Sequence, residues 1–142
     1  ITTDIIVGFP GESEEEFEET LSLYREVEFD NAFVFKYSTR RNTPAAELEQ
    51  QLPQELIEER HAKLLSEVNQ IGATRYEKYI GKKMQILVEG PSRRNKERME
   101  GRTRCNRIVV FDGGERFRGQ LVDLNIIRSG SFTLYGDPVI LK

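Results

Sequence analysis

The hydrophobic pattern of this chain changes near Gly81, and that change limits which folds the chain can adopt. Before Gly81, apolar residues follow a strand, helix, strand, helix order, which is typical of a parallel sheet covered by helices. After Gly81 the apolar runs are short and are separated by Gly and Pro, which is typical of a small β-barrel. The 142 residues therefore predict an α/β part, residues 1–79, followed by an all-β part, residues 80–142.

The beginning of the chain has the pattern of one β–α–β unit. Residues 4–8 form a largely apolar run rich in β-branched residues, as expected of a buried parallel strand. A helix is predicted to begin after Ser13, because Ser13 and Glu16 make a capping box. Four apolar residues then recur at helical spacing and should face the sheet: Phe17, Leu21, Tyr24 and Val27. Residues 32–38 are predicted to form the second strand, parallel to the first.

A second, longer helix is predicted from Gln54, just after Pro53, to about Tyr79, with Gly81 placed to end it. Its apolar stripe consists of Ile57, Leu64, Val68 and Ile71. The strands predicted beyond Gly81 are residues 84–89, 107–111, 119–127, and 132–135 with 139–141. Short strands joined by Gly and Pro turns in so small a segment indicate an antiparallel barrel of OB-like type.

Charge is distributed unevenly between the two parts. Residues 1–79 carry 17 acidic and 8 basic residues, whereas residues 80–142 carry 7 acidic and 13 basic residues. A basic part of this kind predicts an anionic partner, with nucleic acid as the first candidate; the alternative is a solvated basic loop. The predicted phosphate-binding set is Lys82, Lys83, Arg93, Arg94, Lys96, Arg98, Arg102, Arg104 and Arg107.

Several kinds of site are excluded by composition. Cys105 is the only cysteine and His61 the only histidine, so the chain cannot by itself hold an iron–sulfur cluster or a structural zinc ion, and we expect no metal site. No apolar run approaches the roughly 20 residues that a membrane helix needs. We therefore expect no membrane contact and a cytoplasmic location. Because the chain opens directly in a strand without Met, we expect it to be a fragment.

The turn that follows the first strand is a candidate ligand site. Ligands of α/β folds bind beyond the carboxyl ends of parallel strands, and here that position is occupied by residues 6–12, with glycines that permit close approach and Glu12 as an acceptor. The alternative is a tight turn with no ligand. The acidic run of residues 12–19 is interpreted as a solvated face at a helix start, not as a pair of catalytic carboxylates.

Specific strings then make the chain resemble a known family. TDIIVGFPGESEEEFEETLSL and the later FDNAFVFKYSTRRNTPAAEL resemble the end of the radical S-adenosylmethionine (SAM) domain of the methylthiotransferase family. LVEGPSRR, GRTRCNRIVVF and GQLVDLNI resemble a TRAM domain, in the branch of the family that modifies N6-isopentenyladenosine in tRNA. The likeness covers nearly the whole chain. One departure is RRNTPAA, where the family commonly has RPGTPAA, so the shape of that loop should differ.

The resemblance implies a fold and an activity. It implies that residues 1–79 are the last β/α units of a partial TIM-like radical SAM barrel and that residues 80–142 are an RNA-binding TRAM barrel. The full-length parent would convert N6-isopentenyladenosine-37 of tRNA to its 2-methylthio derivative, using SAM and two [4Fe-4S] clusters. Since the cluster cysteines are absent, we expect no catalytic residue in this chain, no cofactor bound to it and no activity from it alone.

The resemblance also assigns site residues and partners. It implies that the SAM pocket includes Ile6, Gly8, Glu12, Phe35 and Tyr37. It implies that a tRNA anticodon stem-loop is contacted by Arg93, Arg94, Arg102, Thr103 and Arg107. Two alternatives remain open: a sister methylthiotransferase acting on threonylcarbamoyl-adenosine tRNA or on a ribosomal protein, and a non-catalytic RNA-binding module. A further hypothesis is that strand edges left exposed by truncation make the chain self-associate.

Overall fold

The computed structural model describes residues 1–139 and separates into two compact units, Ile1–Gly72 and Ala73–Lys142. The division between the units falls inside the second long helix, before the boundary near Gly81 that the sequence predicts. The end of the last predicted strand, residues 140–141, lies outside the described residues.

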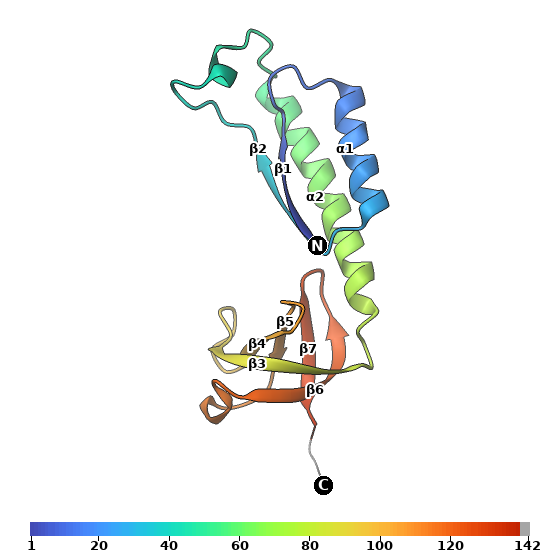
Figure 1. Ribbon diagram of the computed structural model, residues 1–142, viewed down its shortest axis with the longest axis vertical. Helices are drawn as coiled ribbons and strands as arrows, with labels where there is room; N and C mark the ends of the chain where they lie inside the picture. Colours follow the sequence, from blue (N-terminus) through green and yellow to red (C-terminus); the bar gives the residue numbers. More distant parts are fainter. Residues whose placement is uncertain (140–142) are drawn as a thin grey trace. The chain divides into compact units, whose positions relative to one another are not determined.

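The first unit is a two-stranded parallel sheet with helices on one face (Figure 1). Its elements are β1 (Thr2–Val7), α1 (Glu14–Val27), β2 (Asn31–Lys36), the 3-10 helix η1 (Pro44–Glu47) and α2 (Gln54–Glu77), of which the last residues belong to the second unit. In the register of the sheet, Ile6 pairs with Phe35 and Val7 with Lys36. The predicted β–α–β unit with parallel strands is confirmed.

Helix α1 begins and packs largely as its sequence predicts. The side chain of Ser13 accepts a hydrogen bond from the Glu16 amide, and the Glu16 carboxylate accepts one from the Ser13 amide, which completes the capping box. Three of the four residues of its predicted apolar face are buried: Phe17, Leu21 and Tyr24. The fourth, Val27, is 41% exposed, because it lies at the last turn, just before Glu28 ends the helix in the left-handed conformation. The prediction that Val27 packs on the sheet was wrong.

The opposite face of the β1–β2 sheet is apolar and uncovered. Ile6, Phe33 and Phe35 are each at least 50% exposed, while Val7 and Ala32 on the other face are buried. A parallel sheet is normally covered on both faces. One side of this sheet therefore presents large hydrophobic residues to solvent.

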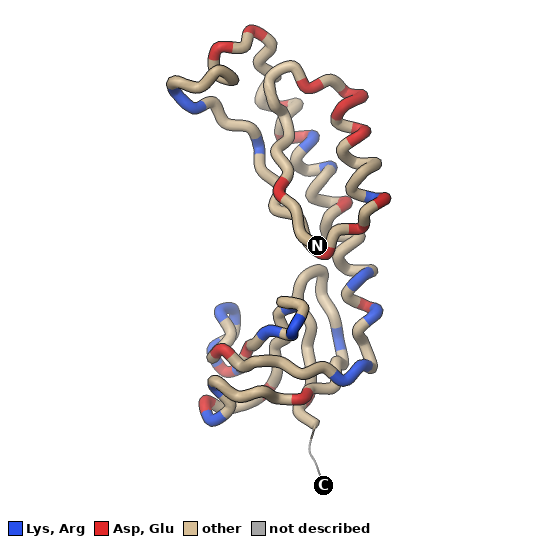
Figure 2. Tube along the Cα trace, in the orientation of Figure 1, with Lys and Arg blue, Asp and Glu red and all other residues tan. Residues whose placement is uncertain are grey.

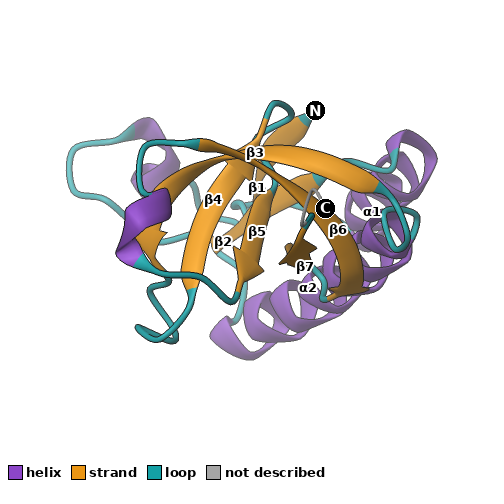
Figure 3. Ribbon diagram, turned by 90° about the horizontal axis from the view of Figure 1, so that it is seen from below, coloured by secondary structure: helices purple, strands orange, loops and turns teal. Residues whose placement is uncertain are grey.

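The second unit contains a closed five-stranded barrel (Figure 3). Its strands are β3 (Lys83–Pro91), β4 (Met99–Thr103), β5 (Ile108–Phe111), β6 (Leu121–Ser129) and β7 (Thr133–Pro138), with the short 3-10 helix η2 (Glu115–Phe117) between β5 and β6. The strand order around the barrel is β3-β4-β5-β7-β6, and β6 pairs with β3 to close it. The predicted small OB-like barrel is confirmed.

Two details of the barrel differ from the sequence-based expectation. The barrel is not wholly antiparallel, because β5 and β7 pair in parallel. A ring with an odd number of strands cannot alternate direction at every step, so at least one pair must be parallel. Strand β4 is not among the predicted strands, because MEGRT lacks a β-branched, apolar pattern.

The barrel core is a single cluster of buried apolar side chains. It comprises Tyr76, Ile86, Val88, Met99, Val109, Phe111, Leu124, Ile126 and Leu134. Gly101 of β4 lies so close to β3 that a Cβ atom there would collide with the backbone carbonyl of Leu87. A glycine is therefore required at this close approach of two strands.

Candidate ligand and nucleic-acid sites

The turn after β1 is built around Gly8. Gly8 has φ +77°, and a Cβ atom on it would lie 2.5 Å from Cγ1 of Ile57 on α2. A residue other than glycine would thus be strained and would also displace the helix. The glycine that the sequence marks as a ligand-approach position is required here by helix packing.

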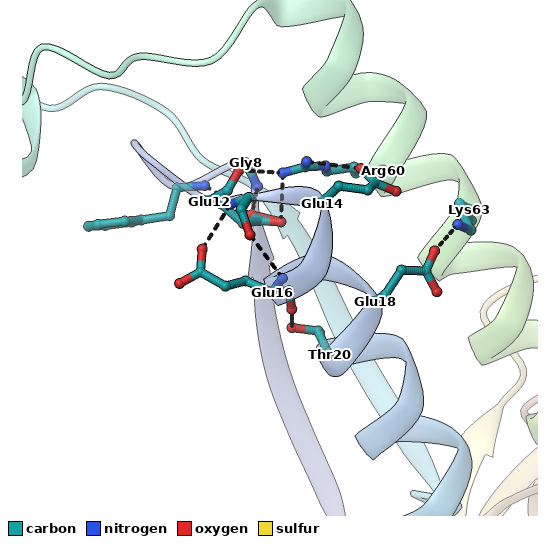
Figure 4. Close-up of polar contacts among 10 residues, drawn as sticks. Gly8, Glu12, Glu14, Glu16, Glu18, Thr20, Arg60 and Lys63 are labelled. Atoms are coloured by element: carbon teal, nitrogen blue, oxygen red, sulfur yellow. Dashed lines mark hydrogen bonds and ion pairs between the residues drawn. The ribbon is translucent and has the colours of Figure 1, made fainter.

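Glu12 closes the same turn (Figure 4). Its Oε2 accepts hydrogen bonds from the backbone amides of Gly8 at 2.5 Å and Phe9 at 3.3 Å. Its Oε1 lies 3.1 Å from Nη1 of Arg60, which also donates to the Glu12 carbonyl oxygen at 2.9 Å. Both carboxylate oxygens therefore have partners within the protein, and Glu12 holds the turn in shape.

Arg60, on α2, is a component of this turn that sequence reasoning missed. Only 4% of the residue is exposed, and its guanidinium lies 5.3 Å from the ring centroid of Phe17 and 3.1 Å from Glu14. It lies 48 positions from Glu12 on a helix rich in charged residues, so no local pattern reveals the pairing. The only signal was its position on the helix face, three residues after Ile57.

The remaining residues predicted for the SAM pocket lie near the carboxyl end of the sheet. Ile6 and Phe35 are neighbours in register on the uncovered face, 59% and 50% exposed. The ring of Tyr37, just beyond β2, packs edge-on against Phe9, with centroids 5.4 Å apart. Phe35 and Tyr37 also line an open cavity of about 680 Å³. This end of the unit thus combines an apolar surface with an open cavity.

Positive charge gathers on the loops of the second unit, while acidic residues line the first turns of α1 (Figure 2). Arg93 and Arg94 are exposed, and no ion pair involves either side chain within residues 1–139. Other members of the predicted phosphate-binding set have acidic partners: Lys83 with Asp123, Arg98 with Asp112 and Arg102 with Glu89. The hydrogen bond from Lys83 lowers the pKa of Asp123 below its ordinary value. Arg93 and Arg94 are thus better placed to bind an external anion than these three.

Two further residues of the predicted RNA site are buried. Thr103 and Arg107 are 6% and 8% exposed. The Thr103 hydroxyl accepts a hydrogen bond from the Arg107 amide at 3.1 Å, and the two residues close the turn that carries Arg104 and Asn106. The Arg107 guanidinium lies 4.6 Å from the ring centroid of Tyr79. Their observed contacts shape the turn.

Arg93, Arg94 and Arg102 line one cavity of about 440 Å³ in the second unit. This volume lies within the range of roughly 300–1,000 Å³ usual for small-molecule sites. The Arg93 amide donates a hydrogen bond to the Glu100 carboxylate at 3.1 Å. This bond fixes the start of the loop that carries Arg93 and Arg94, which we call the arginine loop. The structure therefore brings together three of the five residues predicted to contact RNA.

Within the described residues, 1–139, no group of three or more His, Cys, Asp or Glu side chains is placed to hold a metal ion, and Cys105 is an exposed free thiol. Over the same residues, neither α1 nor α2 is long and apolar enough to cross a bilayer.

The chain is similar to one domain family and to several known proteins. Residues 77–139 match the TRAM domain family. Over 140 residues the chain is 46% identical to the tRNA-2-methylthio-N(6)-dimethylallyladenosine synthase of Methylacidiphilum infernorum (isolate V4), covering 99% of this chain and 30% of that protein. Proteins of the same name from Clostridium botulinum (strain Okra / Type B1) and Alkaliphilus oremlandii (strain OhILAs) are 47% and 43% identical over 139 residues, which is 98% of this chain and 31% and 30% of theirs. The chain thus spans about 30% of the length of these relatives.

Proposed function

Because the chain belongs to a family of tRNA methylthiotransferases and contains a TRAM domain, we propose that it is the C-terminal segment of an enzyme that adds a methylthio group to tRNA. The proposed substrate is N6-dimethylallyladenosine-37, also called N6-isopentenyladenosine, and the proposed location is the cytoplasm. The observation that carries the proposal is the high identity along both units, since a TRAM domain alone would match only residues 77–139.

The first unit would supply one part of the SAM pocket. The proposed pocket residues are Ile6, Gly8, Glu12, Phe35 and Tyr37. Support comes from the exposed Ile6–Phe35 pair and the cavity beside Phe35 and Tyr37, where a flat adenine could rest on apolar side chains. Gly8 and Glu12 would act indirectly, because Glu12 fixes the turn through the Gly8 amide. The unit would be the end of a TIM-like barrel, and the uncovered face of its sheet would face the interior of that barrel.

The residues of this chain do not fit an iron–sulfur cluster. A [4Fe-4S] cluster is held by several cysteine thiolates, and Cys105 is the only cysteine present. The two clusters proposed for the full enzyme would need ligands from other parts of the protein, and the chain by itself should be inactive.

The second unit would bind the anticodon stem-loop of tRNA. Support comes from Arg93 and Arg94, exposed and without an ion pair in the described part of the chain, beside a cavity that Arg102 also lines. Guanidinium groups recognise phosphate through paired hydrogen bonds. Thr103 and Arg107 would contribute by shaping the turn between β4 and β5. A basic surface of this kind is typical of RNA-binding domains.

Binding of the chain to an isopentenylated anticodon stem-loop over a salt series tests this proposal. The wild type should bind, and the logarithm of its affinity should fall linearly with the logarithm of salt concentration. Arg93→Ala/Arg94→Ala should weaken binding at low salt and reduce that slope by about 1.4–1.8, because each lost phosphate contact removes about 0.7–0.9.

The matched control removes two arginines from another part of the same unit. Arg116→Ala/Arg118→Ala causes the same change in net charge around η2, outside the cavity of Arg93 and Arg94. This control should leave the slope near that of the wild type. No binding by the wild type at low salt, or equal effects of the two double variants, would contradict the proposed RNA site.

Isolated from the rest of its enzyme, the chain should also self-associate through the first unit. Support comes from the uncovered apolar face and the two unpaired edges of a two-stranded sheet.

A further inference from the structure

Arg128 and Tyr135 form a stacked pair on the surface of the barrel. They are register partners on β6 and β7, beside an irregularity in the ladder between Ile126 and Arg128. The Arg128 guanidinium carbon lies 3.6 Å from the centroid of the Tyr135 ring, so the cation covers one ring face closely. Arg128 is an exposed residue, and Tyr135 is half-buried beneath it.

The same pair lines the cavity of about 440 Å³ that Arg93, Arg94 and Arg102 also line. Phe132 and the aliphatic side chains of Ile108 and Val110 complete its apolar lining. The cavity therefore combines a planar cation on an aromatic ring with an apolar lining. It is also lined by Arg93 and Arg94, which form no ion pair within the described residues.

We propose that this cavity holds one unpaired nucleotide of the bound RNA, with its base stacked on the Arg128 guanidinium and its phosphate beside Arg93 and Arg94. The inference rests on the proposed RNA-binding function and deepens it, since it names the part of the RNA that is recognised. It predicts a requirement for an unstacked loop base, which a purely electrostatic surface would not have.

Stacking chemistry favours a nucleobase as the occupant. Guanidinium planes and aromatic rings are the two surfaces on which proteins stack unpaired bases, and Arg128 presents the first on top of the second. The guanidinium is weakly hydrated, so little hydration free energy is lost when a base covers its outer face. Duplex RNA would leave this surface unused, because its bases are already stacked.

Charge decides where the phosphate lies. Glu100 also lines the cavity and accepts a hydrogen bond from the Arg93 amide at 3.1 Å, so a phosphate would be held by the exposed side chains of this loop and not by its backbone amide. The side chains of Arg93 and Arg94 are exposed and extend from the loop that follows β3. The phosphate is therefore placed at the arginine loop and the base at the Arg128–Tyr135 pair.

A stem-loop carrying 2-aminopurine at one loop position at a time tests this inference, since stacking quenches the fluorescence of this base. The wild-type chain should change the fluorescence at one loop position and should bind a fully paired duplex of equal length more weakly. Arg128→Lys keeps the positive charge but removes the planar guanidinium group on which the base would stack. It should abolish the fluorescence change and lower affinity about tenfold, a typical loss for one base stack, with the salt slope unchanged.

Variants of Tyr135 provide a second measurement. Tyr135→Leu should act like Arg128→Lys, and Tyr135→Phe, which keeps the ring, should behave like the wild type. Because Arg128 is exposed, Arg128→Lys should fold normally and remains informative even where Tyr135→Leu is destabilised.

The outcomes separate this inference from the proposed function. Salt-dependent binding that requires Arg93 and Arg94, with no loop position quenched and no effect of Arg128→Lys, would overturn the nucleotide pocket and leave the RNA-binding function standing. Absence of binding by the wild type would overturn both.

Discussion

At the scale of single residues, Arg60 places a positive charge where only 4% of the residue is exposed. Burying a charge is costly unless the charge is paired and hydrogen-bonded, and here Glu12 provides both a carboxylate and a carbonyl oxygen. The side chain of Glu12 is itself only 14% exposed. The β1–α1 turn therefore depends on a charge pair that must be complete.

Replacing Arg60 with Ala should lower the free energy of unfolding by about 3 kcal/mol, because it leaves the largely buried Glu12 carboxylate without its positively charged partner. Urea denaturation measures this loss. Lys63→Ala is the matched control, since Lys63 lies on the same helix and pairs with Glu18 at the surface, where both side chains are nearly half exposed. It should cost less than about 1 kcal/mol. Equal losses for the two variants would contradict a special role for Arg60.

Residue roles that depend on short sequence separations could be predicted, and those that depend on long separations could not. The Ser13–Glu16 capping box spans three positions and is present as predicted. The Glu12–Arg60 pair spans 48 positions, so sequence reasoning assigned Glu12 to a ligand and overlooked Arg60. Arg128 was overlooked for a different reason: it lies close to Tyr135 in sequence, but their stacking depends on the register of β6 and β7, which no local pattern shows.

At the scale of elements, α1 and α2 are joined by ion pairs along their facing sides. Arg25 of α1 donates two hydrogen bonds to the Glu67 carboxylate of α2, the shorter at 2.6 Å, and Lys63 pairs with Glu18. The hydrogen bonds from Arg25 lower the pKa of Glu67 below its ordinary value. The charged form of Glu67 is therefore favoured by folding.

A lowered carboxyl pKa stabilises the folded state at neutral pH, and that contribution is lost as the pH falls below about 4.3, the ordinary glutamate value. Glu67→Gln should therefore reduce the loss of stability between neutral and acid pH, by less than about 1 kcal/mol for a pair this near the surface. Chemical denaturation at both pH values measures the difference. Glu59→Gln, which removes an exposed carboxylate from the same helix, is the control for the substitution, and the two variants are compared directly. Identical pH profiles for wild type and Glu67→Gln would contradict the expectation.

Both α-helices were predictable from local pattern, but one strand was not. Strand β4 exists because Gly101 permits close contact with β3 and because β5 supplies its other neighbour. Neither condition is visible in MEGRT itself. The parallel pairing of β5 and β7 likewise follows from closing the barrel, which is a property of all its strands together.

At the scale of the whole chain, the two units differ in whether the edges of their strands are paired. The barrel pairs every one of its strands on both sides, whereas the β1–β2 sheet has two free edges and an apolar face containing Phe33 and Phe35. Free edges beside exposed apolar surface favour association with other strands.

The isolated chain should therefore form dimers or larger species as its concentration rises, measured by light scattering after gel filtration. Phe33→Ser should shift the equilibrium toward monomer. Leu23→Ser on α1 is the control, because Leu23 is 57% exposed like Phe33 but lies away from the sheet. A strictly monomeric wild type at high concentration would contradict self-association.

The parallel pairing of β5 with β7 also has a consequence for synthesis. Among the described residues, β7 is the last strand in sequence, and it supplies both the second partner of β5 and Tyr135, the ring beneath Arg128. A nascent chain that stops before Thr133 leaves β5 and β6 without this partner and lacks the aromatic surface. Closure of the barrel and completion of the proposed nucleotide pocket thus both require β7, so a chain released before Thr133 would have an open barrel and would lack the Arg128–Tyr135 pair.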